Sequence, residues 1–255
     1  MAEKAKPVTH LCYTDVEQIL IRGKNLCADL IGKVSFSEMM LFHLMGATPK
    51  PQQVAIVDAV LVTIMEHGLT PSAIAARQTY FGAPEALQGA VAAGILGIGS
   101  RFAGTSGDCV ELLKDIVAAP DDAKQDVAKS IAKRFRDAKK PVPGYGHPVH
   151  KNGDPRVARL VEIAGEQGVK GNYIEAMYLL GDAVNQATGK NLVINASAAM
   201  GAVMAEVDIP PAIMRGLVIV SRAAGLVGHL LEEMQTPASQ RIWDLVEEGI
   251  PYSES

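Results

Sequence analysis

The sequence predicts an all-α protein, and three observations support that prediction. Residues that favour helices, such as Ala, Leu, Met, Glu, Lys and Gln, are plentiful along the chain. Runs that alternate apolar and polar residues, as a half-buried strand requires, are scarce. Glycine and proline interrupt the chain at intervals that leave room for about ten helices. With 255 residues, of which 48% are hydrophobic, the chain can also bury a large core.

Two helices are expected before residue 70. Ser35 and Glu38 have the spacing of a capping box, which opens a helix that ends near Gly46. The sequence Thr-Pro-Lys-Pro at 48–51 breaks the chain, and an apolar helix is predicted over 52–66. It stops at the glycine of the His67-Gly68 pair.

Four further helices are expected before residue 140. Thr70 and Pro71 supply a capping hydroxyl and a first-turn proline for the first of them. The sequence Gly-Ala-Pro at 82–84 separates it from a helix that runs to Leu96. After a glycine-rich bend at 97–104, helices are predicted over 106–119 and 121–139.

The remaining elements follow a segment that cannot be helical, because residues 141–148 hold three prolines and two glycines. Asp154 and Pro155 then start a helix, and another is predicted over 172–188. The stretch 191–207 is apolar and rich in small residues. Pro210-Pro211 opens the last long helix, to about Met234, and the tail that contains Arg241 ends near the surface.

The composition excludes several classes of protein. A net charge of −4 with 48% hydrophobic residues argues against disorder and against nucleic-acid binding as the main role. Cys12, Cys27 and Cys109 form no C-x-x-C motif, so neither a disulfide scaffold nor a metal site is expected. Charged residues break the longest apolar stretches, and the N-terminus lacks a secretion signal. We therefore expect a cytoplasmic protein that does not enter a membrane.

The loop from Pro143 to Arg156 is the first candidate site. Its glycines and prolines fix an irregular backbone around His147, and Arg156 lies in the first turn of the helix that follows. A helix N-terminus attracts anions, and an arginine there adds to the attraction. The loop is therefore either a carboxylate or phosphate site or a rigid turn whose polar side chains make structural bonds.

Arg222 is the second candidate, because it lies in an otherwise apolar segment, 217–228. A buried arginine needs an anionic partner, which is either an internal Asp or Glu or a ligand carboxylate held in a bidentate fork. His229 lies seven residues further on, on the same helix face, and a structural role is the simpler interpretation for it.

Four blocks of sequence, in this order, resemble the citrate synthase superfamily. They are Glu66–Gly68, Gly99–Gly104, Gly144–Arg156 and a pair formed by Asn195–Ala198 and Ser221–Gly225. The likeness is closest to citryl-CoA lyase, the C-terminal module of ATP-citrate lyase, and it covers roughly residues 55–255. The chain is shorter than a full citrate synthase and is expected to lack much of its N-terminal helical region.

The resemblance implies a citrate synthase-like fold, with a large helical dimerisation domain, a smaller inserted helical domain and an active site between them. By analogy the large domain comprises residues 1–104 and 196–255. The small, CoA-side domain then comprises residues 105–195.

The resemblance also implies roles for individual residues. His67 matches a histidine that binds the oxaloacetate end of the substrate, and His147 matches one that contacts the oxaloacetate carbonyl. Arg156 and Arg222 match two arginines that clamp carboxylates, and Arg241 resembles a third, which the neighbouring subunit supplies. The CoA side is implied at the residues Gly144, Tyr145, Gly146, Arg101 and Phe102.

Two positions depart from the citrate synthase pattern. Phe102 stands where the synthases have a histidine, and this favours the lyase branch. Ser197 stands where the family has its catalytic aspartate. A serine hydroxyl cannot exchange a carbon-bound proton at neutral pH without an adjacent base, and losing a positioned acid or base typically costs about 10²–10⁴-fold in rate.

Three functions are therefore open. The first is a citryl-CoA lyase-like enzyme that cleaves or forms the bond between acetyl-CoA and oxaloacetate, either weakly or with a surrogate acid such as Asp108 or a water. The second is cleavage or hydrolysis of oxaloacetate or another 2-oxo acid without CoA. The third is non-catalytic binding of oxaloacetate or CoA. All three imply a small polycarboxylate or CoA thioester as ligand, no further cofactor, and a homodimer or higher homo-oligomer.

Overall fold

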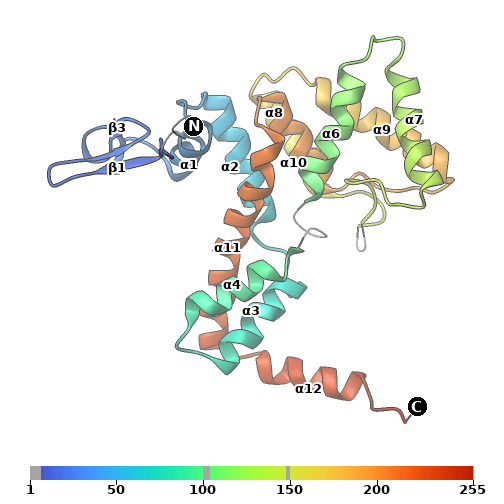
Figure 1. Cartoon of the computed structure of the whole chain (residues 1–255). Coiled ribbons are helices and arrows are strands. Elements are labelled where there is room, and N and C mark those ends of the chain that lie inside the picture. Colours follow the sequence, from blue (N-terminus) through green and yellow to red (C-terminus); the bar gives the residue numbers. More distant parts are fainter. Residues whose placement is uncertain (1–6, 100–103, 148–149, 255) are drawn as a thin grey trace, which may run out of the picture. The chain divides into compact units, whose positions relative to one another are not determined.

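The computed structural model describes residues 7–99, 104–147 and 150–254, and it confirms the all-α prediction (Figure 1). Helices account for almost all of its regular structure. They are α1 (Phe36–Met45), α2 (Pro51–Met65), α3 (Pro71–Gly82), α4 (Leu87–Leu96), α6 (Thr105–Val117), α7 (Lys124–Asp137), α8 (Pro155–Glu166), α9 (Asn172–Thr188), α10 (Ala196–Glu206), α11 (Pro211–Gln235) and α12 (Ser239–Gly249).

Internal contacts divide the chain into two compact units, and the boundary in the sequence falls within α2, between Asp58 and Ala59. The first unit holds a small antiparallel sheet that the sequence analysis did not predict. Its strands are β1 (Cys12–Thr14), β2 (Ile19–Ile21) and β3 (Lys24–Asn25), in the order β1-β2-β3. A π-helical turn (η1, Leu26–Leu30) follows.

A two-residue turn joins β2 to β3. Arg22 and Gly23 both have positive φ, 50° and 80°, as a tight hairpin turn requires. The usual Asn-Gly signal is absent, which is why the hairpin is hard to find in the sequence. The Arg22 guanidinium secures the turn, since its Nε and Nη2 donate to the His43 carbonyl oxygen at 3.1 and 2.8 Å.

Local signals placed most helix ends correctly. The Ser35 hydroxyl accepts a hydrogen bond from the Glu38 N–H at 3.1 Å, and Gly46 ends α1 in the left-handed region. Asp154 caps α8 by accepting from the Arg156 N–H. These caps join residues two or three positions apart, so the sequence alone specifies them.

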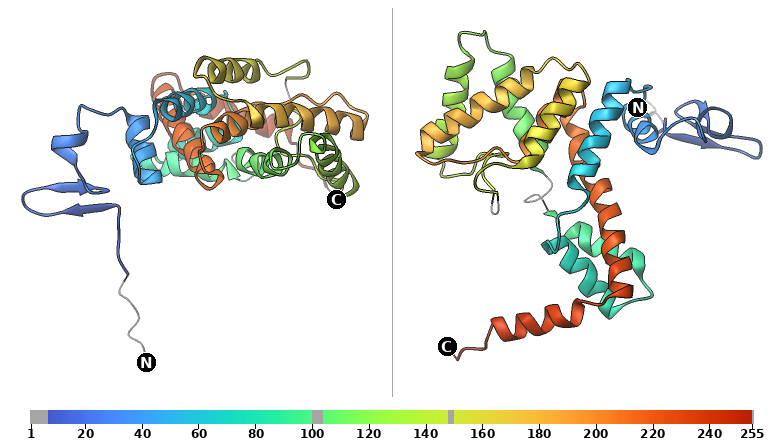
Figure 2. Two further views of the ribbon diagram at one scale, coloured as in Figure 1. Left: turned by 90° about the horizontal axis from the view of Figure 1, so that it is seen from above. Right: turned by 180° about the vertical axis from the view of Figure 1, so that it is seen from behind.

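The second unit contains the helices that form the candidate site. Figures 1 and 2 show α3 and α4 packed at one end of α11, while α6 to α10 gather toward its other end. α10 packs on α6, α8 and α9, although the predicted division placed it in the large domain and the other three in the small one. The domain boundaries predicted from the resemblance stay a prediction.

α10 was not predicted as a helix because it is buried on all sides. Nine of its eleven residues are buried, so the sequence has no polar face and no helical period. α12 was predicted only as a tail, although its apolar residues Ile242, Leu245 and Val246 have helical spacing. All but Ser239 of its residues remain accessible.

α11 is the one helix in the described part of the chain that is long and apolar enough to cross a membrane, judged by length and composition. Half of that apolar stretch is buried inside the protein, and its buried face carries Ser221, Arg222, His229 and Glu233. These features are those of a core helix.

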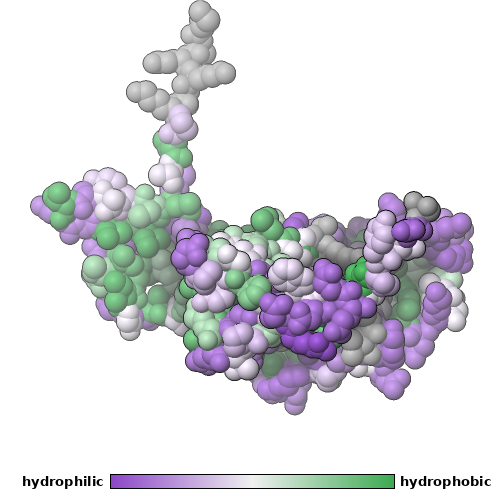
Figure 3. Space-filling view, turned by 90° about the horizontal axis from the view of Figure 1, so that it is seen from below, coloured by the Kyte–Doolittle hydropathy of each residue, from purple (hydrophilic) through white to green (hydrophobic). Residues whose placement is uncertain are grey.

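Figure 3 shows hydrophilic side chains over much of one face of the molecule, with apolar surface gathered beside the first described residues. Several apolar side chains of the first unit are exposed. They include Val8, Leu11, Tyr13, Val16, Ile31 and Phe36.

Candidate active site

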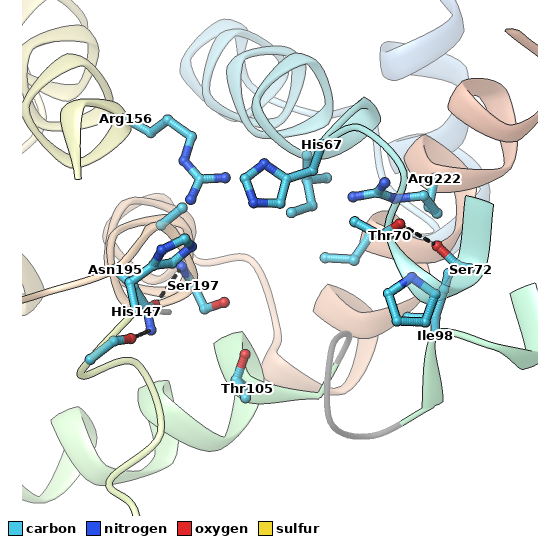
Figure 4. Close-up of a pocket in the computed structure, with 15 residues that line it drawn as sticks. His67, Thr70, Ser72, Ile98, Thr105, His147, Arg156, Asn195, Ser197 and Arg222 are labelled. Atoms are coloured by element: carbon cyan, nitrogen blue, oxygen red, sulfur yellow. Dashed lines mark hydrogen bonds between the residues drawn. The ribbon is translucent and has the colours of Figure 1, made fainter. Parts of the chain in front are cut away.

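A cavity of about 530 Å³ lies in the second unit and brings together residues from six helices and the loops between them (Figure 4). Six of the residues predicted from sequence line it. They are His67, Gly146, His147, Arg156, Ser197 and Arg222. The chain therefore collects, in one place, side chains that are up to 155 positions apart in the sequence.

Arg222, in the middle of α11, is 7% exposed and lines this cavity. Its Nη1 is buried and has no hydrogen-bond partner among the residues that the structure describes. Burial lowers the pKa of its guanidinium, and the nearby charge of Glu66 opposes that shift. A buried cation that lacks a bonded anion is costly, so the site is suited to an anionic ligand.

Arg156 differs from Arg222 because its position is fixed by a neighbour. Its Nε and Nη2 donate to the two carboxylate oxygens of Asp154 at 2.9 and 2.7 Å. The buried Asp154 also accepts from the backbone N–H of Ala196, at 3.0 Å. Burial alone would raise the pKa of this carboxyl. The hydrogen bonds and charge of Arg156, together with the Ala196 N–H, outweigh burial and hold the pKa below its ordinary value. Asp154 thus orients Arg156 and joins α8 to the start of α10.

His67 and His147 also line the cavity, and their ring centroids are 5.9 Å apart in an edge-on arrangement. Figure 4 shows His67 between Arg156 and Arg222. Burial lowers the pKa of both rings; Arg156 and Arg222 lower that of His67 further, and His150 and Arg156 lower that of His147. Both rings are therefore neutral near pH 7.

Nδ1 of His147 accepts a hydrogen bond from the His150 N–H at 3.0 Å. The neutral His147 ring therefore carries its proton on Nε2. That atom is the hydrogen-bond donor of the ring.

The start of α10 forms another wall. Asn195 is the N-cap, and its side-chain oxygen accepts from the Ser197 N–H at 2.9 Å while its amide nitrogen donates to the Gly146 carbonyl at 2.9 Å. Ser197 follows in the first turn and lines the cavity. Neither aspartate nor glutamate is among the residues that line this cavity in the described part of the chain.

Gly144 and Tyr145, predicted on the CoA side, are buried behind the cavity wall. Gly144 has a φ of 91°, and a Cβ there would lie 2.7 Å from the Cβ of Ala198. The Tyr145 hydroxyl donates to the Met177 carbonyl at 2.8 Å, and burial raises its pKa well above the usual value. Of this predicted segment, Gly146 and His147 line the cavity.

Other predicted residues lie elsewhere. Arg241, on α12, has a side chain that is 63% exposed, and it pairs with Glu248 at 3.6 Å outside the cavity lining. Its predicted role in a neighbouring subunit stays a prediction. Asp108, in the first turn of α6, does not line the cavity. Arg101 and Phe102 lie outside the described residues.

Sequence reasoning missed several residues of the cavity. The hydroxyls of Thr70 and Ser72, 3.0 Å apart, line it beside the Thr70-Pro71 helix start. An apolar wall is formed by Ile64, Ile98 and Val218. Position next to a helix start could have pointed to the hydroxyls, but no local signal marks the three apolar residues.

His147, His150 and Asp154 place ligand atoms within 4.8 Å of one another, which is a spacing that could hold a metal ion. The Asp154 carboxylate is already engaged by Arg156 and by backbone N–H groups, and the guanidinium beside it would repel a cation. These contacts fit a scaffold for Arg156 better than a metal site.

Comparisons with known proteins point to one family. The sequence model described as "Citrate synthase, C-terminal domain" matches residues 11–243. The citryl-CoA lyase of Hydrogenobacter thermophilus is 32% identical to this chain and superposes with a TM-score of 0.83, over 97% of this chain and 94% of that one. The ATP citrate lyase of Methanothrix soehngenii, solved with citrate and coenzyme A, has a TM-score of 0.78 over 100% of this chain and 43% of that one; at 20% identity it shares the fold.

A citrate synthase from a Synechocystis strain is 26% identical over 208 residues, which are 79% of this chain and 50% of that protein. The chain thus spans about half the length of the curated relatives it matches.

Proposed function

This chain belongs to the citrate synthase family, and on that premise we propose that it is a citryl-CoA lyase-like enzyme. Its reaction breaks or forms the carbon–carbon bond between acetyl-CoA and oxaloacetate. The observation that carries the proposal is the buried Arg222 Nη1, which has no partner among the described residues in a cavity that also holds Arg156.

The charge of the cavity supports a polycarboxylate ligand. Two guanidinium groups and two neutral imidazoles face the space, and each guanidinium can hold one carboxylate in a bidentate fork. A ligand with several carboxylates, such as the citryl group or oxaloacetate, matches this set.

His147 is proposed to act on the oxygen that changes bond order. Cleavage turns the citryl hydroxyl into the oxaloacetate carbonyl and leaves an acetyl-CoA enolate. The hydroxyl loses one proton and the enolate carbon takes one, so the net reaction neither consumes nor releases a proton. A donor on Nε2 of His147 stabilises charge on that oxygen in either direction.

CoA binding and assembly form part of the proposal. We place the thioester chain beside Gly146, and we propose a homodimer or larger homo-oligomer in which Arg241 reaches the neighbouring site. Exposed apolar side chains on α11 and α12 support an interface, and they include Val227, Leu231, Met234, Trp243, Leu245 and Val246. We also propose a cytoplasmic location.

Ser197 supports a second candidate function. Because the lining in the described residues has no carboxylate, the group that would exchange the acetyl proton is lacking there. Cleavage or hydrolysis of oxaloacetate, or of a related 2-oxo acid, uses the arginines and His147 and needs no acetyl-CoA enolate. That activity would not depend on CoA.

Incubating citryl-CoA with the purified chain, with proton NMR of the products, tests the proposal. Acetyl-CoA and oxaloacetate formed above the uncatalysed rate support a lyase. If citryl-CoA stays intact, oxaloacetate alone is the next substrate, and its turnover supports the second candidate. Tight binding without turnover of either compound indicates a binding protein.

Ser197→Asp sharpens the test. If the carbon acid is merely missing, this substitution raises the rate of citryl-CoA cleavage by about 10²–10⁴-fold, because it restores a positioned carboxyl. Ser197→Asn is the matched control, since it has a similar size but no acid. An equal response of the two variants would contradict the assignment of position 197.

A further inference from the structure

A second set of polar groups, outside the cavity lining and with Arg77, His229 and Glu233 buried, ends on the turn that carries His67. It consists of Arg77 on α3, His229, Glu232 and Glu233 on α11, and Glu66 at the end of α2; we call it the Arg77 network. None of its members takes part in the function proposed above.

Arg77 is the centre of the network and is only 2% exposed. Its Nη1 donates to Glu233 at 2.7 Å, and its Nη2 pairs with Glu232. Its Nε lies 3.2 Å from Nδ1 of His229, and Nη2 lies 3.0 Å from the same atom. The charge of this arginine is thus matched by carboxylates of its own chain, without any ligand.

Arg77 determines the tautomer of His229. A guanidinium can only donate hydrogen bonds, so Nδ1 of His229 must accept. The proton of the neutral ring then lies on Nε2, which is 3.0 Å from Oε1 of Glu66. His229 therefore donates to Glu66 in a fixed direction.

Glu66 links His229 to the backbone at His67. The same Oε1 accepts from the backbone N–H groups of His67 and Gly68, each at 2.7 Å. The turn also lies close against α11, because a Cβ on Gly225 would come within 2.0 Å of the Met65 carbonyl oxygen. The backbone that carries His67 is thus held by a side chain that α11 orients.

We propose that His229 and Glu66, set by Arg77, are positioning residues that hold the His67 imidazole in the cavity. This inference rests on the proposed function only in that His67 binds the ligand there. The network contacts no cavity ligand itself, so its effect on binding comes through the His67 backbone.

Two substitutions of His229 separate the two hydrogen bonds of its ring. Asparagine places an acceptor near the position of Nδ1 and so keeps the partner of Arg77, but it loses the donor to Glu66. Glutamine places a donor near the position of Nε2 and so keeps the bond to Glu66, but it loses the acceptor for Arg77. Positioning and stability thus respond to different variants.

The first measurement is the NMR titration of the His67 C2–H, assigned with His67→Asn. In the wild type we expect a midpoint below the ordinary value of about 6.5. The charged and titratable groups near His67 are Glu66 beside it, Arg156 on α8, Arg222 on α11, and His147, His150 and Asp154 in the loop before α8. In His229→Asn the midpoint should rise toward the ordinary value, while in His229→Gln it should stay near the wild type.

The second measurement is the affinity for citrate by calorimetry. We expect a loss of about 10- to 100-fold in His229→Asn and Glu66→Ala, as is typical when a group that orients a binding histidine is lost. Glu232→Gln is the matched control, because that exposed carboxylate also pairs with Arg77 but does not lead to His67. Urea unfolding of each variant reports its stability.

If the network served stability alone, the shift of the His67 midpoint and the loss of citrate affinity would both follow the loss of stability in urea. His229→Gln would then be affected most, and that ranking would overturn the proposal. An unchanged His67 titration in folded His229→Asn would overturn it as well. If the wild type neither binds citrate nor turns over citryl-CoA, the proposed function fails, while the titration still decides the role of the network.

Discussion

Arg77 and Arg222 are both buried arginines near the Glu66–Gly68 turn, yet the partners of their guanidinium groups differ. Arg77 is bonded to Glu232, Glu233 and His229. Arg222 has a buried Nη1 with no partner among the described residues. The protein thus matches one guanidinium with its own anions, while the other has a nitrogen that no described residue bonds.

This difference assigns the two arginines different roles. A charge that the chain itself neutralises supports the fold, and removing it leaves its partners buried and unpaired. A buried charge without a bonded partner weakens the fold, so we expect Arg222 to serve ligand binding. The predictions below test that contrast.

The largest expected effect is on stability, from Arg77→Met. Glu233 is 3% exposed and would lose its cation, so we expect the free energy of unfolding to fall by about 3–5 kcal/mol. Urea denaturation measures this loss. Glu232→Gln should change the value little, because that side chain is 65% exposed. A loss in Arg77→Met no larger than in this control would contradict a structural role for Arg77.

Arg222→Met should affect ligand binding rather than stability. Because it replaces a buried cation with an apolar side chain, the free energy of unfolding should stay near the wild-type value or rise. The binding free energy for citrate or oxaloacetate should weaken by about 2–5 kcal/mol, measured by calorimetry. Arg222→Lys keeps the charge but loses the fork, so its affinity should lie between those of the wild type and Arg222→Met. Unchanged affinity in Arg222→Met would remove this residue from the site.

The smallest expected effect is a dependence on pH. The pKa values of His67 and His147 are lowered in the folded state, so the unfolded chain binds more protons below about pH 6.5. The histidine contribution to stability is therefore complete above that pH and is lost as the pH falls toward the folded values. An anionic ligand should oppose this lowering of the two pKa values, because it favours the charged form of both rings.

Calorimetry in two buffers of different ionisation enthalpy measures this as proton uptake on citrate binding near pH 6. Arg222→Met should raise the His67 midpoint, since Arg222 is one of the charges that lower it. Binding without proton uptake would show that the two histidines do not face the ligand.

Local chemistry in the sequence was enough for most helix ends and for the two loops that carry His67 and His147. The cap at Ser35, the left-handed Gly46 and the Asp154-Pro155 start each depend on neighbours within a turn. The hairpin at Arg22-Gly23 and the helix α10 were not found, because one lacks the usual turn residues and the other lacks a polar face.

The sequence by itself determined the all-α class, the family likeness and the set of cationic and imidazole side chains at the site. Only the tertiary structure decided which arginine has a partner, since Glu233 is 156 positions from Arg77 and no local pattern connects them. It also decided that Tyr145 points into the core and that Ser197 lines the cavity. The reason is physical: a cap is completed by nearby backbone, whereas a buried charge is matched by whatever group the packing of distant helices brings against it.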